Sequence, residues 1–414
     1  MHTSRSLTRP VVLVAAAWIV TRALMLSELG YWRKGTTVSY QDVNVFHDWA
    51  SRIVSTQSLP AEPSWQYPPG AVIAFLIPRL FGDGYRGAFV GMILVADLIT
   101  TIALVVLATR SGNRLDGVWL WILGLAVLGA LPLLRFDVLP TCIAVVALVL
   151  ASSSARRFGV IVGVGVAVKV WPVLALLAAL ERRRARIATA AAAATTVAFL
   201  VASWLTLDNS FGFLHHQSGR GLELEAVAAT PWYLRQAITG HQVYWIARNG
   251  SLEIDSSKAD LLANILHVGL FVLAAAVLAW WIVWLRRRPA DVTVGRDAVF
   301  TAVLLFMVVS EVLSPQYLVW LIGIGAVAIT SPATRMRRPV AFVGVAVLLT
   351  RAEIGSFGDL VSNGSNGAYL LAFRNVVLLA AAVDAARIMW RAATEAQPGF
   401  GVRDTDEDVE AAPS

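Results

Sequence analysis

Residues 85–108 read YRGAFVGMILVADLITTIALVVLA, a run that is apolar over almost its whole length. A helix that crosses the hydrocarbon core of a membrane needs about 20 such residues. Further apolar runs that meet or approach this length lie on both sides of it, at about 10–28, 116–134, 137–151, 187–207, 260–285, 297–313, 316–331, 339–356 and 368–390. The pattern predicts an all-α polytopic membrane protein.

The composition of the 414-residue chain agrees with a membrane protein and argues against other classes. Hydrophobic residues make up 57% of the chain and charged residues 15%, whereas a soluble domain has about 25% charged residues. A mean hydropathy of +0.67 excludes a disordered or collagen-like chain and argues against a nucleic-acid partner. The net charge of +7 reflects short basic runs between the apolar stretches. The single cysteine, Cys142, excludes a disulfide framework and a cysteine-based metal site.

Two apolar pieces do not have the form of a simple membrane span. Residues 69–81 are short and follow a Pro-Pro pair, and residues 158–180 are interrupted by Lys169 and Pro172, where a helix should break. We therefore expect a bundle of about 10–12 transmembrane or re-entrant helices in a cell membrane, with residues 158–180 forming a hairpin. By the positive-inside rule both termini are cytoplasmic, as are the basic groups at Arg110 and Arg114, Arg156 and Arg157, 182–186, 286–288 and 335–338.

Two polar segments, about 29–68 and 208–259, are too long for tight turns and fall on the extracytoplasmic side in this topology. Loops of this length are usually functional. Apolar residues from Asp42 to Ile53 recur at helical spacing, which predicts an amphipathic helix at the membrane interface. We expect residues 1–396 to form one transmembrane domain and residues 397–414 to form a disordered, acidic cytoplasmic tail. Asp404-Thr405-Asp406 in that tail mimics a metal-binding motif, but it lies on the wrong side of the membrane.

Ionisable and polar residues in or beside the spans are candidates for function, because they are costly in a membrane. Asp42 precedes the predicted amphipathic helix, and the same loop closes with Trp65-Gln66-Tyr67-Pro68-Pro69. A helix-capping aspartate and an aromatic belt at the lipid headgroups explain these residues equally well. Arg135 and Asp137 lie in a tight turn between two spans, where a surface ion pair between the two is the slightly favoured explanation.

Three more candidates lie in the hairpin and in later loops. Lys169, alone in an apolar hairpin, either extends to the membrane surface or meets an anion such as a lipid headgroup. Arg220 follows His215-His216 and could bind a phosphate through two hydrogen bonds, whereas adjacent histidines are poorly spaced for one metal ion. Gln316 lies in a turn broken by Pro315, where its amide could bind hydroxyl groups. No P-loop, GxSxG or HExxH motif occurs.

In chain order these features resemble the GT-C superfamily of polyprenyl-phosphate-sugar glycosyltransferases, and most closely glycosyltransferase family 87. The family includes actinobacterial mannosyltransferases and arabinofuranosyltransferases. The resemblance covers about residues 10–380 and rests on six features: an early Asp after the first span, a loop that closes in Tyr-Pro-Pro, an Arg-x-Asp turn, a broken Lys-x-x-Pro hairpin, an Arg-Gly-Leu-x-x-Glu loop and a Ser-Pro-Gln-Tyr turn. It implies a GT-C-type bundle that transfers a sugar from a polyprenyl-phosphate donor to a glycolipid or glycan acceptor.

The resemblance also implies a role for each candidate. Asp42 matches the first-loop acid of the family, which is the expected general base. Donor phosphate is expected at Lys169, Arg220 and Arg135, and sugar or acceptor contacts are expected at Tyr67, Asp137, His216, Glu223, Glu225 and Gln316. The chain departs from the family at residues 222–223 and 225–226, where the family usually reads Leu-Gln and Glu-Ser. Both acidic residues of this loop therefore stay candidates for one role.

The chemistry of such a transfer is consistent with these residues. A lipid phosphate leaves without a general acid, so one carboxylate that deprotonates the acceptor hydroxyl is enough, and fixed cations stabilise the departing phosphate. A single displacement would invert the anomeric carbon. Asp42 and Asp48 are six positions apart rather than paired as Asp-x-Asp, so we expect neither a metal nor another cofactor.

Mannose is the expected sugar, with arabinofuranose as the alternative. A transporter or lipid flippase is the rival class, since such proteins also break helices in mid-membrane. Against it, no hydropathy repeat relates the two halves of the chain. A non-enzymatic scaffold is a third possibility. Besides donor and acceptor, the expected partners are membrane lipids.

Overall fold

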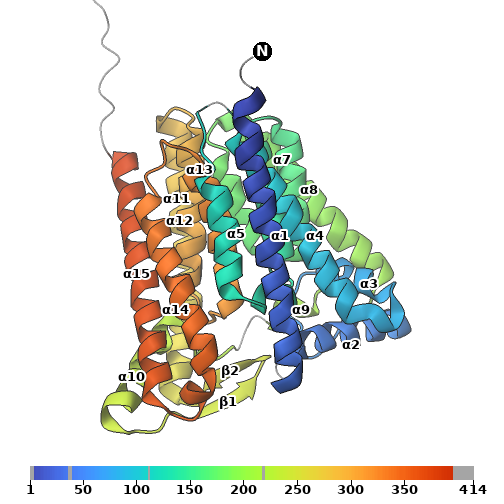
Figure 1. Cartoon of the computed structure of the whole chain (residues 1–414), viewed down its shortest axis with the longest axis vertical. Helices are drawn as coiled ribbons and strands as arrows, with labels where there is room; N and C mark the ends of the chain where they lie inside the picture. The colour runs from blue at the N-terminus through green and yellow to red at the C-terminus, as the bar shows by residue number, and fades with distance from the viewer. Residues whose placement is uncertain (1–3, 36–39, 111, 217–219, 395–414) are drawn as a thin grey trace, which may run out of the picture.

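The computed structural model describes residues 4–35, 40–110, 112–216 and 220–394, and it is almost entirely helical in this part (Figure 1). Among the described residues, seven helices are long and apolar enough to cross a membrane. They are α1 (Ser4–Gly35), α4 (Tyr85–Ala108), α8 (Arg182–Thr206), α11 (Ser257–Arg287), α12 (Val292–Val309), α14 (Arg337–Val361) and α15 (Ser365–Thr394). Three shorter apolar helices join them: α5 (Asp116–Leu128), α6 (Val138–Leu150) and α13 (Leu318–Thr330). The predicted all-α polytopic class is confirmed.

The basic turns of the chain gather at one end of the bundle. In Figure 1 this is the upper end, where α1 begins and α15 ends. Long cationic side chains there reach hydroxyl, carbonyl and carboxylate oxygens of neighbouring turns. The resulting hydrogen bonds tie the turns together: Arg110 to Ser152, Arg184 to Ala151, Arg182 to Leu285 and Arg337 to Asp116. The structure thus places these basic groups on one side, as expected, and their assignment to the cytoplasm stays a prediction.

The expected hairpin over residues 158–180 is confirmed as α7 (Ala155–Val168) followed by the short helix η3 (Trp171–Ala178). The helix ends at Val168, the next residue Lys169 has an extended backbone (φ −156°, ψ 138°), and Pro172 lies in the first turn of η3. Gly159 and Gly163 let α7 approach α8 closely, since a Cβ on Gly159 would lie 2.2 Å from the carbonyl oxygen of Ala188. Small residues four apart are typical of such contacts between helices in membranes.

A buried ion pair joins α1 to α4 inside the bundle. Asp97 accepts two hydrogen bonds of 2.7 Å from the guanidinium of Arg22, and the indole nitrogens of Trp18 and Trp121 donate two more. Each carboxylate oxygen is therefore bonded twice, and the charge is fully compensated. A pair of this kind holds the helices in register and leaves no group free for a ligand.

The opposite end of the bundle carries most of the polar segments and short elements (Figure 1). The predicted amphipathic helix is confirmed as α2 (Gln41–Thr56), which buries Val43, Phe46, Trp49, Ala50 and Ile53. It packs on α3 (Ala71–Arg79), the short apolar piece after the Pro-Pro pair. Helix α2 begins at Gln41 after Tyr40, and no side chain caps it. The interpretation of Asp42 as the helix cap is therefore wrong, because Asp42 lies inside the first turn.

The second long loop contains more regular structure than a bare connection. It includes α9 (Gly212–His216), η4 (Val227–Ala229), α10 (Thr230–Thr239) and a hairpin of β1 (Trp245–Arg248) and β2 (Ser251–Ile254). Asn249 and Gly250 turn this hairpin with φ of 54° and 76°, the positive values that a two-residue turn needs. The remaining short helices are η1 (Gly82–Gly84), η2 (Leu131–Leu134) and η5 (Pro315–Tyr317). The predicted acidic tail, 397–414, lies outside the described residues.

Candidate active site

A cavity of about 300 Å³ lies at the end of the bundle that carries the long loops. Segments far apart in the sequence line it, from α2, the turn around η2, the second long loop, the turn before α13 and the last part of α14. Five candidates predicted from the sequence are among the lining residues: Asp42, Arg135, Glu223, Glu225 and Gln316. The cavity thus brings together the predicted carboxyl groups, the guanidinium of Arg135 and the amide of Gln316.

Asp42 and Arg135 form an ion pair on one wall of this cavity. The distance from the Asp42 Oδ2 to the Arg135 Nε is 2.8 Å, and the two side chains are 39% and 20% exposed. Asp42 is presented by the first turn of α2, and Arg135 follows η2 with an extended backbone. The expected surface pair between Arg135 and Asp137 is wrong, because the extended backbone separates these side chains and each meets a partner from another segment. Asp42 is open enough to meet a substrate hydroxyl.

Lys169 meets the carboxylate of Asp137 rather than the membrane surface. Its Nζ lies 2.5 Å from the Asp137 Oδ1, which also accepts a 2.8 Å hydrogen bond from the indole of Trp320. Four aromatic rings surround the ammonium within 6.0 Å: Tyr67, Phe136, Tyr317 and Trp320. Such faces attract a cation. The anion beside Lys169 in this structure is thus a carboxylate of the protein itself, and the expected contact with a lipid headgroup or donor phosphate stays a prediction.

Tyr67 belongs to this aromatic cluster, and its weakly polar surroundings affect the acidity of its phenol. Burial raises the pKa of its phenol well above the ordinary value, and the nearby Asp137 carboxylate acts in the same direction. The phenol therefore stays neutral at physiological pH and keeps a proton to donate. Neither Tyr67, Asp137 nor Lys169 lines the cavity itself.

Arg220 joins the two long loops. Its guanidinium donates to the side-chain oxygen of Gln66 (2.5 Å) and to the hydroxyl of Ser251 (3.2 Å). In this structure it does not line the cavity. His216 ends α9, but its side chain lies outside the described part of the chain.

Glu223 and Glu225 reach the cavity from a short segment beside β2, in which Glu223 forms an isolated bridge with Glu253 and residues 223–226 make a turn closed by the Ala226 amide on the Glu223 carbonyl (3.0 Å). The Leu224 amide donates to the carbonyl of Leu252 (2.8 Å), and the Ile254 amide donates to that of Leu222 (2.9 Å). Leu222 and Leu224 enter a core shared with α14 and α15, whereas Glu223 and Glu225 line the cavity. Both registers inferred for this loop thus supply a carboxylate to one site.

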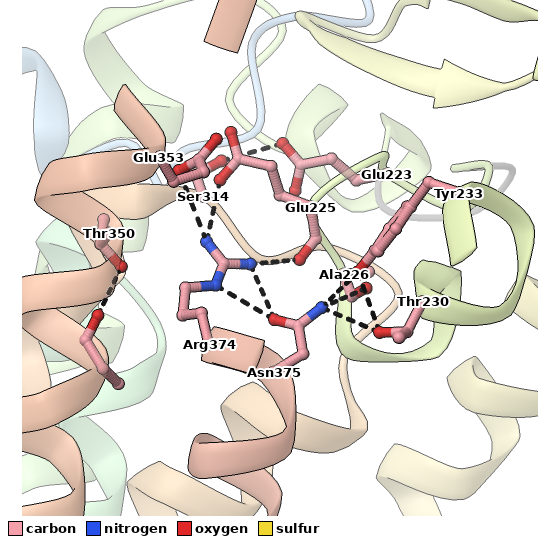
Figure 2. Close-up of polar contacts among 11 residues, drawn as sticks. Glu223, Glu225, Ala226, Thr230, Tyr233, Ser314, Thr350, Glu353, Arg374 and Asn375 are labelled. Atoms are coloured by element: carbon pink, nitrogen blue, oxygen red, sulfur yellow. Dashed lines mark hydrogen bonds and ion pairs between the residues drawn. The ribbon is translucent and has the colours of Figure 1, made fainter. Parts of the chain in front are cut away.

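Polar contacts from α15 and the turn before α13 hold these two carboxylates (Figure 2). Ser314 donates to Glu223 (2.9 Å), and Arg374 donates to the Glu225 side chain (3.1 Å) and backbone carbonyl (2.6 Å). Asn375 accepts from Arg374. Burial raises the pKa of Glu223, and burial together with a neighbouring carboxylate raises that of Glu225 further. These two side chains therefore favour the protonated form more than an exposed glutamate does.

Sequence reasoning missed the contribution of the last two helices. Arg351 and Glu353 of α14 line the cavity, and Arg351 forms an ion pair of 3.0 Å with Glu28 of α1. Arg374 of α15 does not line the cavity itself but holds Glu225 from behind, and it is completely buried. The signal was present, because these charged residues lie within apolar runs where they are costly.

The comparison with protein families agrees with this site. The sequence model of glycosyltransferase family 87 matches residues 65–315, which is more than half of the chain. The chain belongs to glycosyltransferase family 87. Its site residues from Tyr67 to Glu225 lie in the matched region, whereas Asp42 precedes it and Gln316 follows it directly. As a family 87 protein it is a membrane glycosyltransferase, which removes the reason for the transporter and scaffold alternatives. No curated protein and no solved structure matches the chain.

Proposed function

We propose that this glycosyltransferase transfers mannose from a polyprenyl-phosphate donor to a glycolipid or cell-envelope glycan. One observation carries the proposal: a carboxylate, a guanidinium and a group of hydroxyl-binding side chains, contributed by distant segments, line a single cavity. This is the set of groups that an acceptor alcohol and a phosphate leaving group require.

We place the reaction at the extracytoplasmic face of the cell membrane. The cavity lies at the end of the bundle opposite the basic turns, and basic turns are typical of the cytoplasmic side. A donor with a polyprenyl chain would lie in the membrane with its phosphate at the headgroup level, which is where a cavity at the end of the bundle can reach it.

In the proposed reaction Asp42 takes the proton of the acceptor hydroxyl as its oxygen attacks the anomeric carbon. The bond from that carbon to the phosphate oxygen breaks, and the phosphate leaves with the bonding electrons. Arg135, 2.8 Å from Asp42, stabilises the negative charge that develops on the phosphate. One displacement on the face opposite the leaving group inverts the anomeric configuration.

The other candidates extend this site in the proposal. Tyr317 stacks on Trp320 with 4.1 Å between ring centroids and lies 4.9 Å from the Lys169 ammonium. Tyr317 therefore separates Lys169, at the tip of the hairpin, from Gln316 in the cavity. In the proposal Lys169 and Arg220 add positive electrostatic potential for the donor phosphate. We assign sugar or acceptor contacts to six residues: Gln316, Glu223, Glu225, Tyr67, Asp137 and His216.

Transfer assays with purified full-length protein in lipid nanodiscs test the proposal. The donors compared are polyprenyl-phosphate-mannose, polyprenyl-phosphate-arabinofuranose and a nucleotide-linked mannose, each with a membrane glycolipid extract as the acceptor. We expect transfer from polyprenyl-phosphate-mannose. Transfer from the arabinofuranose donor alone would correct the sugar, and transfer from the nucleotide donor alone would contradict the donor class.

A further inference from the structure

Glu353 of α14 is the least compensated charged group among the described residues that line the cavity. It is 0% exposed, and neither of its carboxylate oxygens accepts a hydrogen bond from any residue in the described ranges. The nearest cation is Arg374, at 4.0 Å, and the guanidinium of Arg374 already donates to Glu225 and Asn375. Asp97, equally buried, takes four hydrogen bonds. Asp97 is thus a fully hydrogen-bonded structural carboxylate, whereas the hydrogen-bond donors for Glu353 are missing among the described residues.

Glu353 belongs to an acidic wall, defined as Glu223, Glu225 and Glu353. Figure 2 shows the three carboxyl groups close together above the guanidinium of Arg374. All three residues line the cavity, and the Glu223 Oε2 also lacks a hydrogen-bond donor in the described part of the chain. Unpaired buried oxygens are costly. Burial of this kind in the wall of an open cavity indicates that a ligand supplies the donors.

The chemistry of the acidic wall selects the class of ligand. An ionised phosphate carries hydrogen-bond acceptors and cannot supply the donors that Glu353 and Glu223 lack, so the donor phosphate belongs to the wall with Arg135 and Arg351. No group of three acidic, histidine or cysteine side chains has the arrangement of a metal site among the described residues. The remaining class of ligand is one with neutral hydroxyl groups. Each hydroxyl can donate one hydrogen bond to a carboxylate oxygen and accept one from a protonated carboxyl group.

We propose that Glu353, with Glu223, forms a polyol subsite that accepts hydrogen bonds from the hydroxyl groups of a neutral acceptor sugar and rejects an anionic one. This inference rests on the proposed function, because the sugar bound here is the acceptor of that reaction. It adds Glu353 of α14 to the site and a preference for neutral over anionic acceptor sugars. The cavity is then divided, with a phosphate-binding wall at Arg135 and a hydroxyl-binding wall at Glu353.

Two substitutions separate this role from a purely structural one. Glu353→Leu removes the carboxylate at similar volume, and Glu353→Gln keeps a hydrogen-bonding group without the charge. If Glu353 binds hydroxyls, Glu353→Leu leaves the melting temperature unchanged or raises it, since an uncompensated buried group disappears. If Glu353 only compensates the positive charge of Arg374, Glu353→Leu lowers the melting temperature, because part of that compensation is lost. The matched control is Glu181→Gln, an exposed glutamate before α8.

Binding is measured by saturation-transfer NMR on the full chain in phosphatidylcholine nanodiscs, which carry no sugar headgroups. The probes are methyl α-mannopyranoside and mannose 6-phosphate, which share a ring and differ in charge. We expect the neutral probe to bind, the phosphate to bind at least about tenfold more weakly, and Glu353→Leu to weaken the neutral probe by about tenfold or more, as for lost hydrogen bonds to a charged group. Glu353→Gln should lie between wild type and Glu353→Leu, and Glu181→Gln should match wild type.

Three results would overturn the inference: no binding of the neutral probe by wild type, equal binding of the phosphate, or a Glu353→Leu variant that melts earlier and binds normally. Because no donor and no turnover are involved, failure of this test is distinct from failure of the proposed transfer reaction. A chain that binds the neutral probe as expected but transfers nothing from polyprenyl-phosphate-mannose would keep the subsite and refute the donor assignment.

Discussion

Replacement of Lys169 by methionine is expected to destabilise the protein, and the cause is Asp137. The Asp137 side chain is 4% exposed and receives its positive partner from Lys169 at 2.5 Å. Without the ammonium, this carboxylate keeps the 2.8 Å hydrogen bond from Trp320 but no counter-charge. Removal of one partner from a buried pair costs about 3–5 kcal/mol of unfolding free energy. Methionine fills a similar volume, so lost packing adds little.

The double variant Lys169→Met with Asp137→Asn separates stability from function. Asparagine removes the stranded charge and can still accept from Trp320, so most of the lost stability should return. Unfolding is followed by tryptophan fluorescence in detergent, and transfer kinetics are measured on the same preparations. If Lys169 contributes to donor binding, the double variant regains its melting temperature but keeps a raised KM for the polyprenyl-phosphate donor.

Either of two results would refute this reasoning about Lys169. A single Lys169→Met variant as stable as wild type would show that Asp137 does not depend on the ammonium. A double variant with both normal stability and normal donor KM would leave Lys169 a structural residue and confine the donor phosphate to Arg135 and its neighbours.

Two further predictions concern the acidic wall and the orientation. The pKa of Glu225 is raised in the fold by burial and a neighbouring carboxylate, so the folded chain binds this proton more tightly. The resulting stability is full below the ordinary glutamate pKa of about 4.3 and is lost as pH rises through the raised value. The melting temperature of wild type should therefore fall relative to that of Glu225→Gln as pH rises from about 5 to about 8, and a constant difference would contradict the raised pKa. In a Cys142→Ala background, Ser257→Cys should react with an impermeant thiol reagent on intact cells and Ser153→Cys should not, and the reverse pattern would invert the topology.

The spans and the break in the hairpin could be predicted because the membrane imposes strong local rules. A helix in lipid needs a long apolar run, and the lysine and proline at positions 169 and 172 both interrupt one. The arginines also predicted which turns share one end of the bundle. These signals lie within single segments, so the sequence contains them without knowledge of tertiary contacts.

The partners of the charged residues could not be predicted in the same way. Arg135 pairs with Asp42, far away in the sequence, and the neighbouring Asp137 pairs with Lys169 from the hairpin. Nothing local distinguishes these pairs from one between Arg135 and Asp137, because the choice depends on how three segments approach one another. Ser314 and Glu223 likewise meet only after the second loop joins the turn before α13.

Other features had a local signal that we did not use. Glu353 lies within an apolar run, where an ionisable residue indicates function. The Asn249-Gly250 pair is typical of a two-residue hairpin turn. What the sequence lacks is the information that the Glu353 carboxylate has no hydrogen-bond donor, since this depends on every residue around it.

The most direct test of the proposed reaction compares wild type with Asp42→Asn in transfer from polyprenyl-phosphate-mannose labelled at the anomeric carbon. Asparagine keeps the size of the side chain but cannot take the hydroxyl proton, and loss of a partly exposed ion pair with Arg135 costs at most about 1 kcal/mol of stability. Asp48→Asn, on the exposed face of the same helix, is the matched control. We expect wild type and Asp48→Asn to form a product with the anomeric configuration opposite to that of the donor, and Asp42→Asn to form none while melting near the wild-type temperature. Substantial turnover by Asp42→Asn, or a product with the configuration of the donor, would contradict Asp42 as the base of a single inverting displacement.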